Sequence, residues 1–256
     1  SYTYKDLSSL SADSDSKVIR GEESGVTRVY SVAEAEKFIK ANTESLPTIE
    51  KKWDFAENTT ATEGENVPVV SGSAAWNETN QNIKFNANVT APGTLSLKLN
   101  PAIGNKANVN FDLYVGALGG QTFTYEINDS EGTNLVNCSF NVYNGTGSMV
   151  IGSEEIAVDS DVTSAVSKVS GDGMSSSVTQ VSNEINFTTN TVTVNIGSKS
   201  FTGKLTGAET GLISDISFKS ERSKKADRSI YLDNLVVREY ETDSSDTDET
   251  AFPKFK

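Results

Sequence analysis

Apolar and polar residues alternate along many short segments of the chain, which predicts β-strands with one buried side and one solvent-facing side. Two runs show this most clearly, the first with Ile83, Phe85, Ala87 and Val89 on one side and the second with Val109, Phe111, Leu113 and Val115. Turn sequences such as APGT at 91–94 and YNGTG at 143–147 separate such runs. The pattern predicts an all-β protein built as an antiparallel two-sheet β-sandwich.

One segment near the start has helical spacing instead. Ser31 and Glu34 form a capping box, residues 32–46 place apolar side chains on one face, and Pro47 marks the end. We therefore expect a polar lead-in at 1–26, a single β-sandwich domain at 27–240 that includes the helix, and an acidic tail at 241–256. That tail suits a linker to further domains of the same protein.

Composition narrows the classes of function. The formal net charge of −13 disfavours nucleic acid and anionic membrane surfaces, and favours a neutral or cationic partner. The absence of His, with Cys138 as the only Cys, excludes His-dependent catalysis, an intrachain disulfide and a Cys/His zinc site. We expect Cys138 to be an inert buried thiol. No signal peptide is recognised, and no run of about 20 apolar residues predicts a membrane span.

The segment SIYLDNLVV at 229–237 places two polar residues inside an apolar strand. Strict alternation puts Asn234 on the side of Ile230 and Leu232, and Asp233 on the opposite side with Tyr231. A buried carboxylate or amide has to be hydrogen-bonded, paired or bound to a cation. We interpret the pair as a polar clasp that joins the last strand to the first.

Four segments carry a resemblance to a known group of domains: WDFAEN at 53–58, FTYEINDSEGTNL at 123–135, INFTTNTVTVNIGSKSF at 185–201 and the long run 213–237. Over residues 50–240 the chain resembles lectin-like, concanavalin-type β-sandwich modules of bacterial polysaccharide-degrading systems, including starch-binding proteins of gut Firmicutes. The resemblance implies a jelly-roll-like sandwich in which the early DF strand lies near the final DN strand. It also implies a secreted or cell-surface protein that binds a polysaccharide, first of all starch, without cleaving it.

Carbohydrate binding needs exposed aromatic rings for the C–H faces of sugars and polar groups for their hydroxyls. The candidate binding residues are aromatic or polar side chains that lie in mostly polar segments. They are Trp76, Asn77, Asp112, Tyr114 and Tyr143. We expect Trp76 and Tyr114 to belong to one saccharide site. Trp53 and Tyr125 are expected in the core instead, because each shares a strand side with a Phe residue.

Other functions stay open at this point. A structural Ca²⁺ ion is a natural partner for an acidic β-sandwich, with Asp54 and Asp233 as the candidate ligands. A hydrolase would need two carboxylates at a suitable separation, and no spacing in the sequence singles out such a pair. We expect a non-catalytic protein, with a polysaccharide-active hydrolase or lyase domain and a structural or adhesive module as the alternatives.

Overall fold

The structure is a computed structural model of the 256-residue chain. It describes residues 11–13, 18–23, 26–31, 47–86, 91–116, 120–141, 143–158, 161–166, 168–169, 178–207, 209–222 and 229–241. The chain divides into two compact units, Ser1–Leu46 and Pro47–Lys256. The boundary therefore falls at Pro47, and residues 27–46 of the domain expected at 27–240 belong to the first unit.

The first unit contains a three-stranded antiparallel sheet with the order β1-β2-β3. Its strands are β1 (Ser11–Asp13), β2 (Val18–Glu23) and β3 (Val26–Ser31). Parts of the expected polar lead-in thus form strands. The helix predicted at 32–46 lies outside the described residues.

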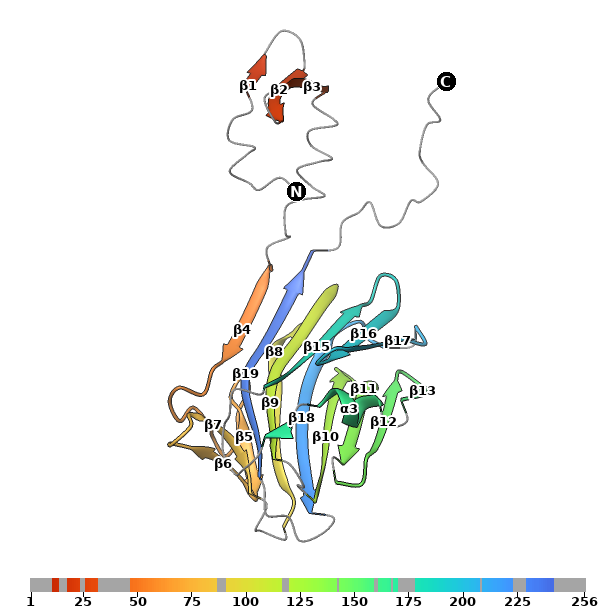
Figure 1. The fold of residues 1–256 in the computed structure, drawn as a ribbon. Helices are drawn as coiled ribbons and strands as arrows, with labels where there is room; N and C mark the ends of the chain where they lie inside the picture. Colours follow the sequence, from red (N-terminus) through yellow and green to blue (C-terminus); the bar gives the residue numbers. More distant parts are fainter. Residues whose placement is uncertain are drawn as a thin grey trace. The chain divides into compact units, whose positions relative to one another are not determined.

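The second unit is the predicted β-sandwich, and Figure 1 shows its two sheets as layers of long strands. The seven-stranded sheet has the order β13-β12-β11-β10-β18-β8-β5. Its strands are β5 (Val69–Gly72), β8 (Gly93–Ile103), β10 (Gln121–Asp129), β11 (Asn134–Asn141), β12 (Thr146–Ile151), β13 (Glu154–Ile156) and β18 (Ile213–Arg222). All pairings in this sheet are antiparallel.

The nine-stranded sheet has the order β17-β16-β15-β9-β19-β7-β6, with β4 paired to β19 and β14 paired to β9. Its strands are β4 (Ile49–Trp53), β6 (Ala74–Asn77), β7 (Asn82–Phe85), β9 (Lys106–Gly116), β14 (Lys168–Val169), β15 (Thr179–Asn186), β16 (Thr191–Ile196), β17 (Lys199–Lys204) and β19 (Ile230–Tyr240). Only β14 pairs in parallel among these described strands. The pairing of β4 with β19 confirms that the early DF segment lies beside the final DN strand.

The core lies between the two sheets and consists of the alternating apolar residues. In β10 every second residue from Gln121 to Asp129 is buried, as a strand between solvent and core requires. Phe111 of the nine-stranded sheet makes edge-to-face contacts with Tyr125 and Phe218 of the other sheet, at centroid distances of 5.1 and 5.0 Å. The predicted core positions of Trp53 and Tyr125 are confirmed, at 8% and 0% exposure.

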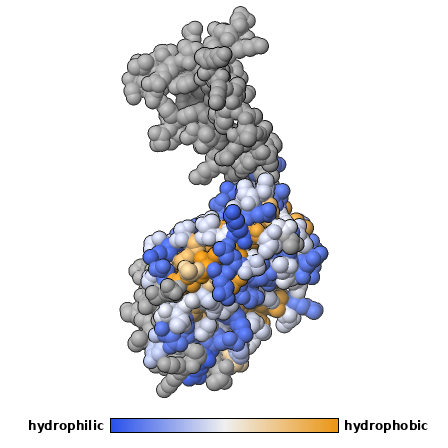
Figure 2. Space-filling view, turned by 90° about the vertical axis from the view of Figure 1, so that its right-hand side faces the viewer, coloured by the Kyte–Doolittle hydropathy of each residue, from blue (hydrophilic) through white to orange (hydrophobic). Residues whose placement is uncertain are grey.

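The described part of the second unit consists almost wholly of strands, turns and loops. A single short helix, α3 (Asp161–Ala165), lies in the described residues and packs near β11, β12 and β17. Figure 2 shows the face of the molecule that includes β12, β13 and β17, where hydrophilic residues prevail and apolar residues are exposed in several places. Within the described residues, no helix is long and apolar enough to cross a membrane.

Candidate functional site

The polar pair in the last strand sits at a β-bulge. Asp233 pairs with Asp112 on β9, whereas Val236 pairs with Asn110, so β19 has one residue more than its neighbour between these pairs. Asn234 takes a φ of 50° and is exposed. The strict alternation expected for this strand is therefore wrong, because the extra residue turns Asn234 away from the core side.

The amide of Asn234 holds β19 to β9. Its side-chain N–H donates to Asp112 Oδ2 at 2.9 Å, and its backbone N–H donates to Asp233 Oδ1 at 2.8 Å. A polar clasp is thus present, and the strand that it joins to β19 is β9. We expected a clasp to β4, the first strand of the sandwich, and the bulge explains the difference, because it turns Asn234 toward Asp112.

Three carboxylates gather around this bulge. Burial raises the pKa of Asp233, the Asn234 N–H lowers it, and the negative charges of Asp112 and Asp54 raise it further. No group of three or more acidic, His or Cys side chains in the described part of the chain is arranged to hold a metal ion. The Ca²⁺ site expected at Asp54 and Asp233 therefore stays a prediction.

Tyr114 lies next to these carboxylates on the outer face of the nine-stranded sheet, the face turned away from the other sheet. Its neighbour in register on β19 is Tyr231, over whose ring Lys84 Nζ lies at 5.6 Å from the centroid. Partial burial raises the pKa of Tyr114, and the charges of Asp112 and Asp233 add to this effect. The structure thus brings together Tyr114 and Asp112 as predicted.

Trp76 does not join them. It pairs with Ile83, which is fully buried, so its side chain lies on the core side of β6, whereas Tyr114 lies on the outer side of the same sheet. The indole N–H donates to the carbonyl oxygen of Phe55 at 2.9 Å. Asn77 donates to Asn82 Oδ1 at 3.2 Å. The expected site shared by Trp76 and Tyr114 does not form, because the sheet itself separates the two rings.

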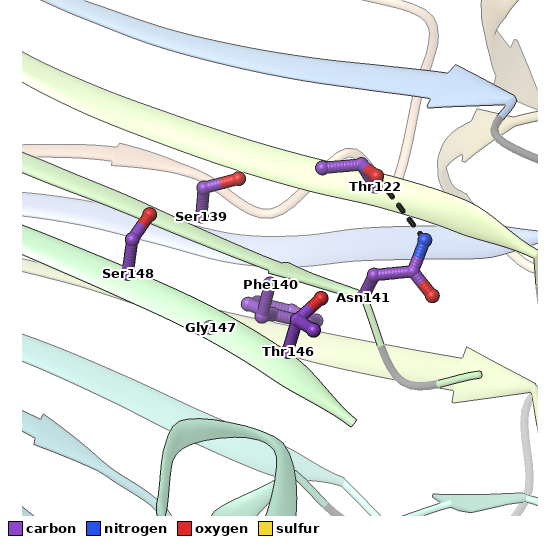
Figure 3. Close-up of a pocket in the computed structure, with 7 residues that line it drawn as sticks. All are labelled: Thr122, Ser139, Phe140, Asn141, Thr146, Gly147 and Ser148. Atoms are coloured by element: carbon purple, nitrogen blue, oxygen red, sulfur yellow. Dashed lines mark hydrogen bonds between the residues drawn. The ribbon is translucent and has the colours of Figure 1, made fainter. Parts of the chain in front are cut away.

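A shallow groove of about 170 Å³ lies on the outer face of the seven-stranded sheet. Figure 3 shows hydroxyl and amide side chains of three neighbouring strands above this part of the sheet. The groove is lined by Thr122, Ser139, Phe140, Asn141, Thr146, Gly147 and Ser148. None of these seven residues is ionisable, so the groove offers hydrogen bonds without a charge of its own.

Asn141 organises one end of the groove. Its Nδ2 donates to Thr122 Oγ1 at 3.1 Å, and its Oδ1 accepts from the backbone N–H groups of Tyr143 and Asn144 at 3.1 Å each. This arrangement shapes the tight turn between β11 and β12. Asn141 is itself 2% exposed, so the groove end is built on a buried, hydrogen-bonded amide.

Tyr143 sits in that turn and is 48% exposed, the largest exposure of any aromatic residue in the described part of the second unit. Tyr143 is not one of the residues that line the groove, but its backbone N–H is hydrogen-bonded to the groove residue Asn141, so its exposed ring belongs to the turn at that end of the groove. An exposed aromatic ring offers an apolar surface that the hydroxyl groups of the groove do not. The sequence predicted Tyr143 as a site residue but did not predict the groove. The groove could have been suspected from the Thr, Ser and Asn residues at the outward positions of β10, β11 and β12, but how these residues align depends on strand register.

Comparisons with known proteins give distant likenesses. No protein-family model matches the sequence, and no curated protein matches it. Among solved structures, the chain is 12% identical to a mutant form of the carbohydrate recognition domain of Emp46p over 78% of this chain and 100% of that one, with a TM-score of 0.49.

Two further structures show how distant such likenesses are. A Bacillus subtilis protein of unknown function with a galectin-like fold is 7% identical over 77% of this chain and 97% of that one, with a TM-score of 0.48. A sialidase is 13% identical over 58% of this chain but only 14% of its own length, with a TM-score of 0.41. At these values the likenesses say nothing about a ligand.

Proposed function

We propose that this protein is a non-catalytic carbohydrate-binding module that binds a neutral polysaccharide at the groove beside Tyr143. The observation that carries the proposal is an uncharged groove of hydroxyl and amide groups that ends at the turn carrying Tyr143, the most exposed aromatic residue in the described part of the second unit. A sugar can lay its C–H face on Tyr143 while its hydroxyls exchange hydrogen bonds with Thr146 and Ser148.

Charge supports a neutral ligand. The chain carries a net charge of −13, which repels acidic polysaccharides at low ionic strength. The groove lining offers no cationic side chain that would compensate a uronate or sulfate group. Starch is the first ligand to test, and a secreted or cell-surface setting with further linked domains suits such a module.

Chemistry at the groove argues against hydrolysis there. Glycoside hydrolysis generally requires two carboxyl groups on either side of the scissile bond. The seven groove residues include no Asp and no Glu. A binding role therefore fits this site better than catalysis, and a bound sugar should dissociate from the protein chemically unchanged.

Affinity electrophoresis tests the proposal. Native gels containing soluble starch, hydroxyethylcellulose or galactomannan should retard the wild type in at least one case, and Tyr143→Ala should migrate as in a gel without polysaccharide. Tyr114→Ala is the matched control, since it removes the same side chain from the outer face of the other sheet.

The possible results separate the candidate functions. Loss of retardation in Tyr114→Ala with retention in Tyr143→Ala would move the site to the nine-stranded sheet. Release of reducing sugar during incubation would indicate an enzyme. If no polysaccharide in these gels and no sugar on a glycan array is bound, the carbohydrate-binding proposal is wrong and a structural or adhesive role is favoured.

A further inference from the structure

The groove is one end of a longer feature, which the strand register reveals. Starting at the groove, one residue from each of six adjacent strands stands in a single line across the seven-stranded sheet. The line consists of Ser148, Ser139, Thr124, Lys219, Thr94 and Ser71, in the order β12-β11-β10-β18-β8-β5. Five of its six members carry a hydroxyl group, and we call this line the hydroxyl row.

The hydroxyl row lies on the outer face and can be reached from solvent. Ser148, Lys219 and Ser71 are exposed, and the other three members are partly exposed. Adjacent hydroxyl groups of the row already form hydrogen bonds with one another. Thr124 Oγ1 donates to Ser139 Oγ at 2.9 Å, and Ser71 Oγ and Thr94 Oγ1 share a hydrogen bond of 2.7 Å. Because each hydroxyl both donates and accepts, every hydroxyl member retains capacity for a further partner.

The single charge in the row is paired. Lys219 Nζ forms an ion pair with Glu221 at 2.6 Å, with both side chains about half exposed. The row thus presents a nearly neutral strip even at β18. Its neutrality matches that of the groove, with which it shares Ser139 and Ser148.

The rows on either side are different. The next row in one direction begins and ends with Val150 and Val69 and contains Glu126, whose carboxylate accepts from Asn137 at 2.8 Å. In the other direction the line from Thr146 ends in a carboxylate at Glu221. A row made almost wholly of hydroxyls is therefore specific to this line and not a general property of the polar face.

We propose that an extended polysaccharide chain lies across the strands along the hydroxyl row, with the groove and Tyr143 binding one end of the bound stretch. This inference rests on the proposed function and adds the class of ligand, a linear polymer recognised internally. Six strands at a spacing of about 4.8 Å give a row about 24 Å long, far more than a single sugar ring occupies. A polymer also repeats its hydroxyls along its length, as the row does across the sheet.

Length dependence tests this inference. Isothermal titration of the wild type with the disaccharide, tetrasaccharide and hexasaccharide of the α-1,4-glucose and β-1,4-glucose series should give affinities that rise with length in one series. The hexasaccharide should bind about tenfold more tightly than the disaccharide, which is about 1.4 kcal/mol.

The far end of the row provides the decisive variant. Ser71→Ala combined with Thr94→Val removes both hydroxyls of a mutually bonded pair, so neither hydroxyl is left without its partner in the pair. It should abolish the gain from disaccharide to hexasaccharide while disaccharide binding stays as in the wild type. Ser96→Ala is the matched control, because Ser96 lies on the same face of β8 two residues from Thr94 but outside the row.

Each outcome decides a separate point. Equal affinity for all lengths, or an unchanged hexasaccharide affinity in the Ser71/Thr94 variant, overturns the polymer-binding inference while leaving the groove as a sugar site. Absence of binding to every oligosaccharide, to all three polysaccharides of the gels and to the glycan array refutes the proposed function and this inference with it. Circular dichroism melts confirm that each variant is folded.

Discussion

Asp129 should be a main contributor to stability at one end of the seven-stranded sheet. This carboxylate is fully buried at the end of β10. Its Oδ1 accepts from the backbone N–H groups of Glu131 and Thr133 at 2.9 and 2.7 Å, and its Oδ2 accepts from the Thr210 N–H at 3.0 Å. It therefore ties the turn after β10 to the loop before β18, two segments about 80 residues apart in the chain.

The expected loss follows from these three bonds. A hydrogen bond to a charged group contributes about 1.5–3 kcal/mol, and a donor left without a partner costs about as much. Glu131 and Thr133 are exposed residues, so water can replace part of what is lost there. We expect Asp129→Ala to lower the free energy of unfolding by about 3 kcal/mol and Asp129→Asn by about 1.5 kcal/mol, since the amide places an N–H group where an acceptor is needed.

Urea titration followed by circular dichroism measures both values, with Glu131→Gln as the control because this exposed side chain lies in the same turn.

The pH dependence of the unfolding free energy gives a second readout. Burial tends to raise the pKa of Asp129, but the N–H groups of Thr210, Thr133 and Glu131 outweigh it and lower the pKa. A carboxyl group with a lowered folded pKa stabilises the fold above its unfolded pKa of about 3.9, and this stabilisation is lost as the pH falls through the lower folded value. If Asp129→Asn matched the wild type within about 0.5 kcal/mol at pH 7, or lost stability in acid as steeply, the hydrogen-bond argument would be wrong.

Three further predictions concern other sites. Asn234→Ala should lower the free energy of unfolding by about 1–2 kcal/mol in urea titration, since it loses the bond to Asp112 and puts Ala at a positive φ, whereas Asn234→Gly should lose only the bond. Asp233→Asn should raise the melting temperature at pH 7 but not at pH 3. The pKa of Asp233 is raised in the folded state, so ionisation of this carboxyl group destabilises the fold as the pH rises. Equal effects of the substitution at both pH values would contradict this reasoning. Burial raises the pKa of Cys138 to about 12, so iodoacetamide at pH 8 should label the thiol only in urea, and rapid labelling of the native protein would show that the thiol is not buried.

The sandwich could be predicted because alternation is a local property of the sequence. Val109, Phe111, Leu113 and Val115 have to share one side of any regular strand, and all four are at most 1% exposed. By the same alternation Tyr114, which lies between Leu113 and Val115, faces the opposite side, and the structure places it there. Burial of apolar side chains dominates the stability of such strands, so the periodic pattern is enough to assign their two faces.

The sites were harder to predict because they depend on register and on local backbone exceptions. The extra residue at Asn234 turns a polar side chain outward, and no spacing in SIYLDNLVV announces it. Trp76 has polar neighbours in sequence, yet its pairing with Ile83 places the ring on the core side. The hydroxyl row is the extreme case, because its members come from six strands spread between residues 71 and 219.

The hydroxyl row and the surroundings of Tyr114 differ in charge, and this difference favours the hydroxyl row as the surface for a neutral polymer. Around Tyr114 a ligand would meet the carboxylates of Asp112 and Asp233, where burial and the repulsion between the two charges raise the pKa of Asp233. Desolvating such charges under an uncharged ligand is unfavourable, because a sugar hydroxyl replaces only part of the hydration that is lost. Hydroxyl groups are weakly hydrated by comparison, and exchanging their water for sugar hydroxyls is nearly neutral in free energy. Under the proposed function, net affinity would then come from an apolar contact at Tyr143 and from the number of sugar units that the hydroxyl row engages together.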